Sequence, residues 1–463
     1  MRRFVRWGSW ITVIVLVAGL LIYANREALV LEAVGFAVKQ RTPVGPYQDI
    51  TWSTGADPQG RPVDERPPNI VLILADDLGW NDLTFLGGGV AGGTVPTPNI
   101  DSIAARGVTF TNGYAANGTC APSRAAIMSG RYGTRFGCEF TPTPPGMMKL
   151  AALGGREPGR LRETITYPDA EAVDYEDMGM PASEITIAEL LAERGYHTAH
   201  IGKWHLGRAS GMAPHDQGFK ESLLMASGLY LPEDHPDVVN AKQDFDPIDH
   251  FLWAVMRFAV AFNGEKAFEP DRYLTDYFTD QAVKAIEANR DRPFFLYLAH
   301  WAPHTPLQAA REDYEALSHI ENHRERVYAA MIRSLDRGVG RVLDALKDNG
   351  LEDNTLVLFT SDNGGAGYIG LPEVNSPFRG WKINVSDPPG RTWLFDMTAD
   401  PTEQHDLSAQ RPDKLAELQA ALARHNAEQA PPAWPSQASV PINIDKDLSQ
   451  PDAPDDEYIY WSN

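Results

Sequence analysis

The sequence predicts an α/β fold in which a large, mostly parallel sheet lies between helices, with a small α+β piece at the C-terminal end. Almost wholly apolar runs are the pattern of strands buried on both faces, and the chain has four candidates: residues 69–75, 197–201, 294–299 and 355–360. Between them, residues 185–194 and 328–348 carry apolar side chains at helical spacing. Strands that alternate with helices indicate a sheet covered by helices on both faces.

The N-terminus has the pattern of a membrane signal-anchor over residues 1–28. A basic flank, which contains Arg2, Arg3 and Arg6, precedes an apolar run from Trp10 to Ala24. The run approaches the roughly 20 residues that cross a bilayer, and a basic end stays in the cytoplasm. We therefore expect the rest of the chain to be periplasmic or otherwise extracytoplasmic and anchored to the membrane. A cleaved signal peptide, which would release a secreted protein, is the alternative.

The remaining chain divides into three parts. Residues 29–68 follow the anchor as a linker with many prolines, headed by a juxtamembrane helix over residues 28–38. Residues 69–382 contain the predicted sheet and are expected to form the main domain. Residues 383–463 form a small subdomain with a predicted helix over residues 412–429 and an acidic tail.

Composition limits the classes of partner. The formal net charge is −21, with 62 acidic and 41 basic residues, so we expect no nucleic-acid partner. The chain has two cysteines, Cys120 and Cys138, without the C-x-x-C spacing of a zinc site. A disulfide between them, or two inert thiols, is the plain structural interpretation.

Polar side chains follow each predicted strand at the point where it ends. In open α/β sheets the carboxyl ends of the strands form the edge where ligands bind. The four sets are Asp76-Asp77, Lys203 with His205, His304, and Asp362-Asn363. Three carboxylates and an amide oxygen are ligands for a hard divalent cation, calcium or magnesium. The alternatives are separate turns and helix caps that have no common function.

The segment Cys120-Ala121-Pro122-Ser123-Arg124 resembles the signature at which sulfatases convert a cysteine to formylglycine. Four further segments are similar to sulfatase motifs: Thr97 to Asp101, Gly195 to Gly207 with its G-K-W-H, Pro303 to Pro306, and Trp393 to Asp396 followed by Asp400 to Glu403. The resemblance extends from about Asn69 to Leu407. It implies the alkaline-phosphatase-like fold and a sulfuric ester hydrolase, and it implies a formylglycine-generating enzyme as a partner.

The resemblance also implies roles for individual residues. Hydrated formylglycine at Cys120 would attack sulfur, close to Arg124, which neutralises charge. The metal ligands would be Asp76, Asp77, Asp362, Asn363 and the modified Cys120. Lys203 would bind sulfate oxygens as a point charge, His205 would assist sulfate release, and His304 or Lys382 would protonate the leaving alcohol.

The sequence departs from the family pattern immediately after Lys382. Sulfatases continue there with E-G-G-x-R-V-P and a long strand–helix stretch, whereas this chain passes through Ile383 to Gly390 directly to its closing motif. An internal deletion would produce this arrangement, and Trp381-Lys382 could equally begin the C-terminal sheet. We therefore expect an exposed apolar edge or a reduced sheet near residues 380–395, because a lost strand uncovers its neighbours.

The substrate class stays open at the level of sequence. A sulfated small molecule or a sulfated glycan would both suit the predicted site, and the loops over residues 138–183 and 208–275 would select between them. Two alternatives remain: a phosphonate or phosphodiester hydrolase of the same superfamily, and a catalytically impaired truncated relative that binds sulfated ligands.

Overall fold

A computed structural model describes residues 25–62, 65–144, 147, 165–167, 173–209, 211–371, 373–382, 385–386 and 392–462. Its centre is a six-stranded sheet made of β1 (Asn69–Ala75), β3 (His197–Gly202), β4 (Glu221–Gly228), β6 (Phe258–Phe262), β7 (Phe294–Ala299) and β9 (Thr355–Ser361). The strand order is β6-β4-β3-β7-β1-β9. All neighbours are parallel except β6, which runs antiparallel to β4. The predicted α/β fold with a mostly parallel sheet is confirmed.

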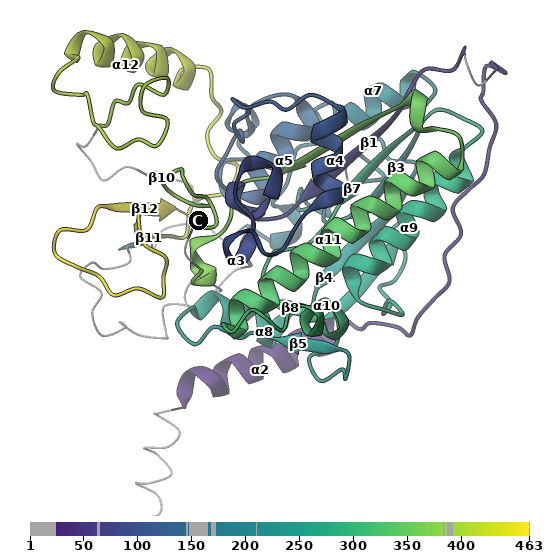
Figure 1. Cartoon of the computed structure of the whole chain (residues 1–463), viewed down its shortest axis with the longest axis horizontal. Helices are drawn as coiled ribbons and strands as arrows, with labels where there is room; N and C mark the ends of the chain where they lie inside the picture. The colour runs from purple at the N-terminus through teal and green to yellow at the C-terminus, as the bar shows by residue number, and fades with distance from the viewer. Residues whose placement is uncertain are drawn as a thin grey trace, which may run out of the picture.

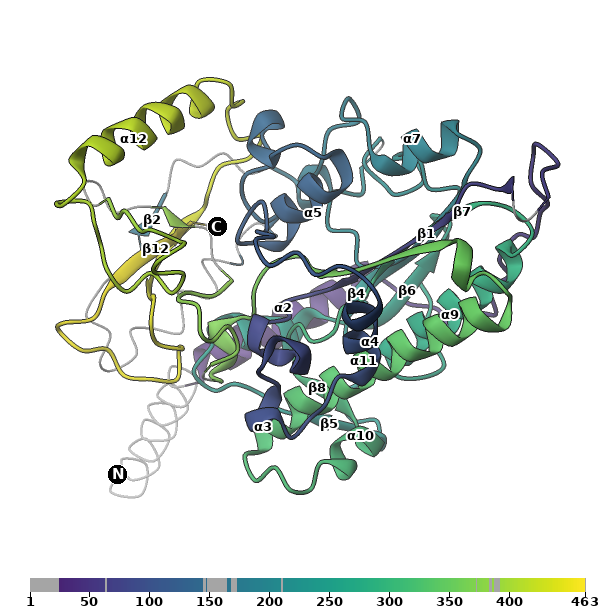
Figure 2. The same ribbon diagram turned by 45° about the horizontal axis from the view of Figure 1, so that its top comes forward.

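Helices cover both faces of the sheet, as the views in Figures 1 and 2 show. On one face, α9 (Leu274–Asn289) and α11 (His323–Asp348) enclose the larger core, which contains Val71 and Leu296. On the other face, α5 (Cys120–Ser129) and α7 (Ile187–Glu193) enclose a core that contains Leu72 and Phe295. Successive strand residues thus enter opposite cores, as the apolar runs predicted.

The predicted helices are present with shifted ends. The helix predicted at residues 28–38 is α2 (Arg26–Arg41), the one at residues 185–194 is α7, the one at residues 328–348 is the later part of α11, and the C-terminal one is α12 (Pro412–Asn426). The described part of the chain also contains the α-helices α3 (Val90–Gly93), α4 (Pro98–Arg106), α8 (Pro247–Val255) and α10 (Arg311–Ala316). The anchor run Trp10 to Ala24 lies outside the described residues. Among the helices that are described, none is long and apolar enough to cross a bilayer.

The C-terminal part forms a small sheet beside α12, set apart from the main sheet in Figure 2. Its strand order is β10-β12-β11-β2, and the strands are β2 (Ile165–Thr166), β10 (Val385–Ser386), β11 (Ala438–Asn443) and β12 (Tyr458–Ser462). A further pair, β5 (Val238–Asn240) with β8 (Gln308–Ala310), lies near α10. Residues 208–275 were predicted to be a loop, but in the structure they supply β4 and β6 to the main sheet.

Strand β9 corrects one expectation. It was predicted to be buried on both faces, but Leu356 is 50% exposed and Leu358 is 39% exposed. These residues pair with Ile70 and Leu72 of β1, whose side chains enter the core beneath α5 and α7. The helices on that face do not extend over β9, and within the described chain β9 is also the sheet edge. An exposed apolar edge therefore exists at residues 355–361, whereas residues 383, 384 and 387–391, within the stretch for which the edge was predicted, lie outside the described residues.

Candidate active site

Cys120 is the first residue of α5 and is buried against the ends of the central strands. Its Sγ lies 3.5 Å from Asp76 Oδ1 and 3.9 Å from Asp77 Oδ1. Burial raises the pKa of the thiol to about 12, although Lys203 and Lys382 oppose the shift. Cys138 is a separate, buried free thiol, so the disulfide alternative is wrong.

The acidic residues meet because β1 and β9 are adjacent and parallel. Asp77 follows β1 with a φ of +62°, and its N–H donates to Asp362 Oδ1 over 3.3 Å. The Asn363 amide nitrogen donates to Asp77 Oδ1 over 2.8 Å. Asn363 Oδ1 is buried and accepts no hydrogen bond from any described group. The sequence prediction that these two pairs share one edge is thus reproduced in the geometry.

Arg124 contacts one carboxylate from each pair, Asp76 after β1 and Asp362 after β9. It is completely buried, its Nε donates to Asp362 Oδ2 over 2.9 Å, and its Nη2 lies 3.3 Å from Asp76 Oδ2. Burial opposes ionisation of Asp362, but Arg124 and Lys203 hold its pKa below the ordinary value. Burial raises the pKa of Asp76, and the Asp362 charge adds to the rise. Ser123 Oγ donates to the Asp362 carbonyl, which joins α5 to the segment that follows β9.

Lys203 and His205 reach the site from the end of β3. Gly202 has a φ of +109°, and a Cβ atom there would lie 1.9 Å from the Ala299 carbonyl oxygen, so only glycine fits. The turn directs Lys203 Nζ to within 2.7 Å of Asp76 Oδ2. His205 Nδ1 is buried and has no partner among the described groups. Burial, assisted by the charge of Lys203, lowers the pKa of His205 well below its usual value.

Lys382 and His304 close the opposite side of the site. Lys382 Nζ lies 2.8 Å from Asp77 Oδ2 and 3.2 Å from His304 Nε2. His304 Nδ1 donates to the Thr305 carbonyl over 2.6 Å, which leaves Nε2 as an acceptor for the ammonium group. Burial and the charge of Lys382 lower the pKa of His304 well below its usual value.

The charges of this cluster balance. Three carboxylates face three cationic groups: Asp76, Asp77 and Asp362 against Arg124, Lys203 and Lys382. Ligand atoms of Asp76, Asp77, Cys120 and His304 lie within 4.8 Å of one another. The carboxylate oxygens and the unpartnered Asn363 oxygen fit a hard divalent cation. With such a cation the pocket would carry a net charge of about +2, which suits an anionic substrate group.

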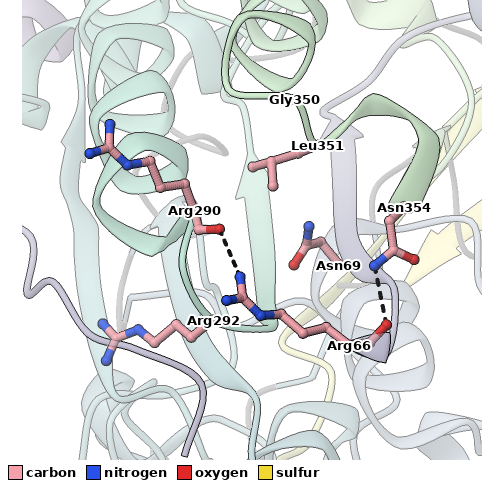
Figure 3. Close-up of a pocket in the computed structure, with 7 residues that line it drawn as sticks. All are labelled: Arg66, Asn69, Arg290, Arg292, Gly350, Leu351 and Asn354. Atoms are coloured by element: carbon pink, nitrogen blue, oxygen red, sulfur yellow. Dashed lines mark hydrogen bonds between the residues drawn. The ribbon is translucent and has the colours of Figure 1, made fainter. Parts of the chain in front are cut away.

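A second hollow lies at the amino ends of β1 and β9, away from this cluster. Arg66, Arg290 and Arg292 line it together with Asn69, Gly350, Leu351 and Asn354. Figure 3 shows that the three guanidinium groups do not converge, and that Arg66 donates to the Arg290 carbonyl. Arg292 donates to the Ser53 carbonyl. This hollow therefore lacks the convergent groups that would bind an anion.

A sequence model of the sulfatase family matches residues 68–388. This chain belongs to the sulfatase family. Mouse N-acetylgalactosamine-6-sulfatase is 34% identical over 320 residues, which cover 68% of this chain and 54% of the mouse protein. The uncharacterized sulfatase YdeN of Escherichia coli (strain K12) is 31% identical over 344 residues, 68% of this chain and 55% of YdeN. This sulfatase thus spans about half the length of the curated relatives that it matches.

Solved structures share the fold of this chain. The crystal structure of Ps i-CgsB matches this sulfatase with a TM-score of 0.61 and 26% identity, over 80% of this chain and 95% of that chain. The structure of Ps i-CgsB in complex with k-i-k-neocarrahexaose matches with a TM-score of 0.61 and 25% identity. The alkaline-phosphatase-like fold that the sequence resemblance implied is that of these neighbours.

Sequence reasoning did not identify two side chains of this sulfatase that contact predicted site residues. Trp301 stacks on His304 with ring centroids 3.8 Å apart, and Lys203 Nζ lies 4.6 Å from the Trp301 ring centroid. The Tyr368 hydroxyl donates to Asp77 Oδ2 over 2.8 Å. Single aromatic residues in loops have no periodic pattern, so the only available signal was their position after a strand that ends at the site.

Proposed function

We propose that this sulfatase hydrolyses a sulfate ester by means of a formylglycine made from Cys120 and a divalent cation. The observation that carries the proposal is the position of Cys120 Sγ, 3.5 Å from Asp76 Oδ1 in a charge-balanced cluster. This position puts the reacting group beside the carboxylates that would hold a cation, which is the arrangement that a nucleophile attacking a sulfate ester requires. Formylglycine supplies a hydrated aldehyde whose hydroxyl is the nucleophile towards sulfur.

The cation is Ca²⁺ or Mg²⁺ in this proposal. Asp76, Asp77, Asp362 and Asn363 would hold it, and Arg124 orients Asp362. His304 is the fourth member of the measured cluster, but its Nε2 already faces Lys382, so we place it outside the ligand set. A divalent cation at this position supplies positive charge opposite the sulfate oxygens.

The other residues of the cluster bind the sulfate group and move protons. Lys203, 2.7 Å from Asp76, offers a point charge to a sulfate oxygen. Lys382 and His304, 3.2 Å apart, form the pair that supplies a proton to the oxygen of the leaving alcohol as its bond to sulfur breaks. His205 Nδ1, which is buried without a partner among the described groups, accepts the proton of the second hydroxyl of the hydrated aldehyde as sulfate departs.

The substrate is a sulfated glycan or a sulfated small molecule. Support comes from the relatives: one is an N-acetylgalactosamine-6-sulfatase, and the structural neighbour Ps i-CgsB was solved with k-i-k-neocarrahexaose. The excess positive charge of a cation-loaded pocket also favours an anionic ester. Contacts beyond the sulfate group depend on the loops around the site, and these are specific to each chain.

The N-terminal part holds the enzyme at a membrane, outside the cytoplasm. The basic and apolar segment before Asn25 supports this localisation. Helix α2 adds to the support, because Leu31 packs inward while Leu29, Val30 and Phe36 are exposed by 46%, 37% and 66%. Extraction of the full chain from membranes by detergent but not by high salt is the expected result; release by salt alone would contradict it.

Mass spectrometry across Cys120 tests the central proposal. The full chain is produced together with a formylglycine-generating enzyme, and the peptide is examined for conversion of the thiol to an aldehyde. The same sample is assayed with an aryl sulfate and an aryl phosphodiester, and Cys120→Ala serves as the control. Aldehyde together with sulfate release supports the proposal. Aldehyde without sulfate release identifies an impaired relative, and turnover of the phosphodiester alone identifies the phosphodiesterase alternative.

A further inference from the structure

Tyr368 lies beside the predicted metal ligands and is assigned no role by the motifs of the family. It occupies a 3-10 turn, Gly367–Ile369, in the segment between Asn363 and Lys382. Its side chain is 8% exposed, and the edge of its ring meets Trp381 at a centroid distance of 6.1 Å and an angle of 75°. Trp381 in turn donates to the Asn443 carbonyl of β11 over 3.2 Å. The Tyr368 ring is therefore held through Trp381, which is itself hydrogen-bonded to the small C-terminal sheet.

The two oxygens of Asp77 have different surroundings. Oδ1 accepts a hydrogen bond from the Asn363 amide and lies 3.9 Å from Cys120 Sγ. Oδ2 accepts a hydrogen bond from the Tyr368 hydroxyl at 2.8 Å. Lys382 Nζ lies 2.8 Å from each oxygen and donates to the Tyr368 oxygen over 3.1 Å. Oδ1 thus faces Cys120, while Oδ2 faces the tyrosine.

We propose that Tyr368 is a positioning residue that makes Asp77 a single-oxygen ligand of the divalent cation. The proposal rests on the proposed function, because that function requires the cation. The hydroxyl engages Oδ2, so Oδ1 is the oxygen that faces Cys120. Lys382 contacts both oxygens and the Asn363 amide donates to Oδ1. Without the hydroxyl, Oδ2 therefore loses a neutral hydrogen-bond donor and can turn towards the cation.

The expected effect is on the choice of cation. Mg²⁺ requires near-ideal octahedral geometry, whereas Ca²⁺ accepts one or both oxygens of a carboxylate in a flexible shell. Groups that orient a metal ligand typically contribute about 10–100-fold to metal affinity. Tyr368→Phe keeps the ring that packs on Trp381 and removes only the hydroxyl. We expect it to weaken Mg²⁺ binding by about 10–100-fold and Ca²⁺ binding by much less.

The test is calorimetric titration of CaCl₂ and MgCl₂ into the metal-free full chain that carries formylglycine. Tyr196→Phe is the matched control, because it removes a buried hydroxyl that donates to the Pro68 carbonyl over 2.9 Å, at the opposite end of the sheet. Thermal melting of the metal-free proteins shows whether both variants are folded. The control should bind both cations as the unsubstituted enzyme does.

The outcomes are distinct. A rise in the Ca²⁺-to-Mg²⁺ affinity ratio in Tyr368→Phe alone supports the proposal. Equal losses for both cations, or no loss, overturn it while the proposed function stands. If the unsubstituted enzyme binds neither cation, both the proposed metal site and the role of Tyr368 are wrong. If Tyr368→Phe does not fold, Tyr368→Trp and Trp381→Phe replace it, and an unchanged affinity ratio in both overturns the proposal.

Discussion

The ammonium nitrogen of Lys382 lies 2.8 Å from a carboxylate oxygen of Asp77, although 305 residues separate them in the chain. The Lys382 N–H also donates to the Gly365 carbonyl over 3.1 Å, so the segment that leaves Asn363 returns to the same edge of the sheet. The departure from the family pattern begins only after this lysine. The side chains described around Cys120 therefore all precede the point of that departure.

Replacing Lys382 should lower kcat/KM while the protein still folds. Lys382→Met removes a cation that faces Asp77 and the leaving-group side of the site. Loss of one preorganised charge of this kind costs about 10²–10³ in turnover, so we expect that loss in kcat/KM for an aryl sulfate. Lys414→Met, on α12 and 43% exposed at its side chain, should leave kcat/KM unchanged. A loss below tenfold for Lys382→Met would show that this lysine takes no part in the reaction.

Gly202→Ala should destabilise the fold and displace Lys203. The residue has a φ of +109°, and the new Cβ would lie 1.9 Å from the Ala299 carbonyl oxygen. Backbone strain alone costs about 1–3 kcal/mol, and the steric clash adds to it. Gly60→Ala is the control, since Gly60 also has a positive φ, of +64°, but no atom lies within 4 Å of its added Cβ. Calorimetric melting temperatures should fall further for Gly202→Ala; equal shifts would refute the steric argument.

Acid should destabilise the protein through buried histidines. Burial lowers the pKa of His300 to about 3, below the unfolded value of about 6.5. Between these values the unfolded chain binds a proton that the folded chain does not bind, so stability is present above pH 6.5 and is lost as pH falls. The loss from this group is about 1.4 kcal/mol per pH unit.

His300→Leu isolates the effect from those of other titrating groups. Urea unfolding at pH 6 and pH 5 gives the change in the free energy of unfolding for each protein. We expect the unsubstituted enzyme to lose about 1.4 kcal/mol more than the variant over this unit of pH. Identical losses would mean that His300 is hydrated or ionised in the folded state.

The exposed face of β9 should make the enzyme prone to self-association. An uncharged edge strand with exposed apolar residues offers a template for another strand, and Leu358 is 39% exposed there. Leu358→Lys should reduce association in sedimentation velocity and change the free energy of unfolding by no more than about 0.5 kcal/mol. Val357→Lys, whose side chain packs against the larger core, should instead destabilise by about 1.5–3 kcal/mol. Unchanged association for Leu358→Lys would exclude β9 as the contact.

Local sequence patterns predicted most of the fold and of the site, for identifiable reasons. Strand β1 and Cys120 lie in segments whose composition reflects their own burial or chemistry, so each could be recognised separately. The position of β9 at the edge could not be predicted, because strand order depends on contacts between distant segments and not on the apolar run itself. Tyr368 was missed because one tyrosine in a loop gives no periodic signal. The exposed apolar edge was expected from the missing segment, but its location required the strand order.

Two residues of the candidate metal site, Asp362 and Asn363, follow directly after the strand that has a neighbour on one side only within the described chain. Fraying of an outermost strand needs far less free energy than global unfolding. Backbone amides of β9 should therefore exchange with deuterium before those of β3 and β7, and the cation and Arg124 would lose their partners in the same opening. On mild heating, activity would then be lost at a lower temperature than that of cooperative unfolding. Added Ca²⁺ would raise the temperature of inactivation, because the bound cation would link the end of β9 to the end of β1.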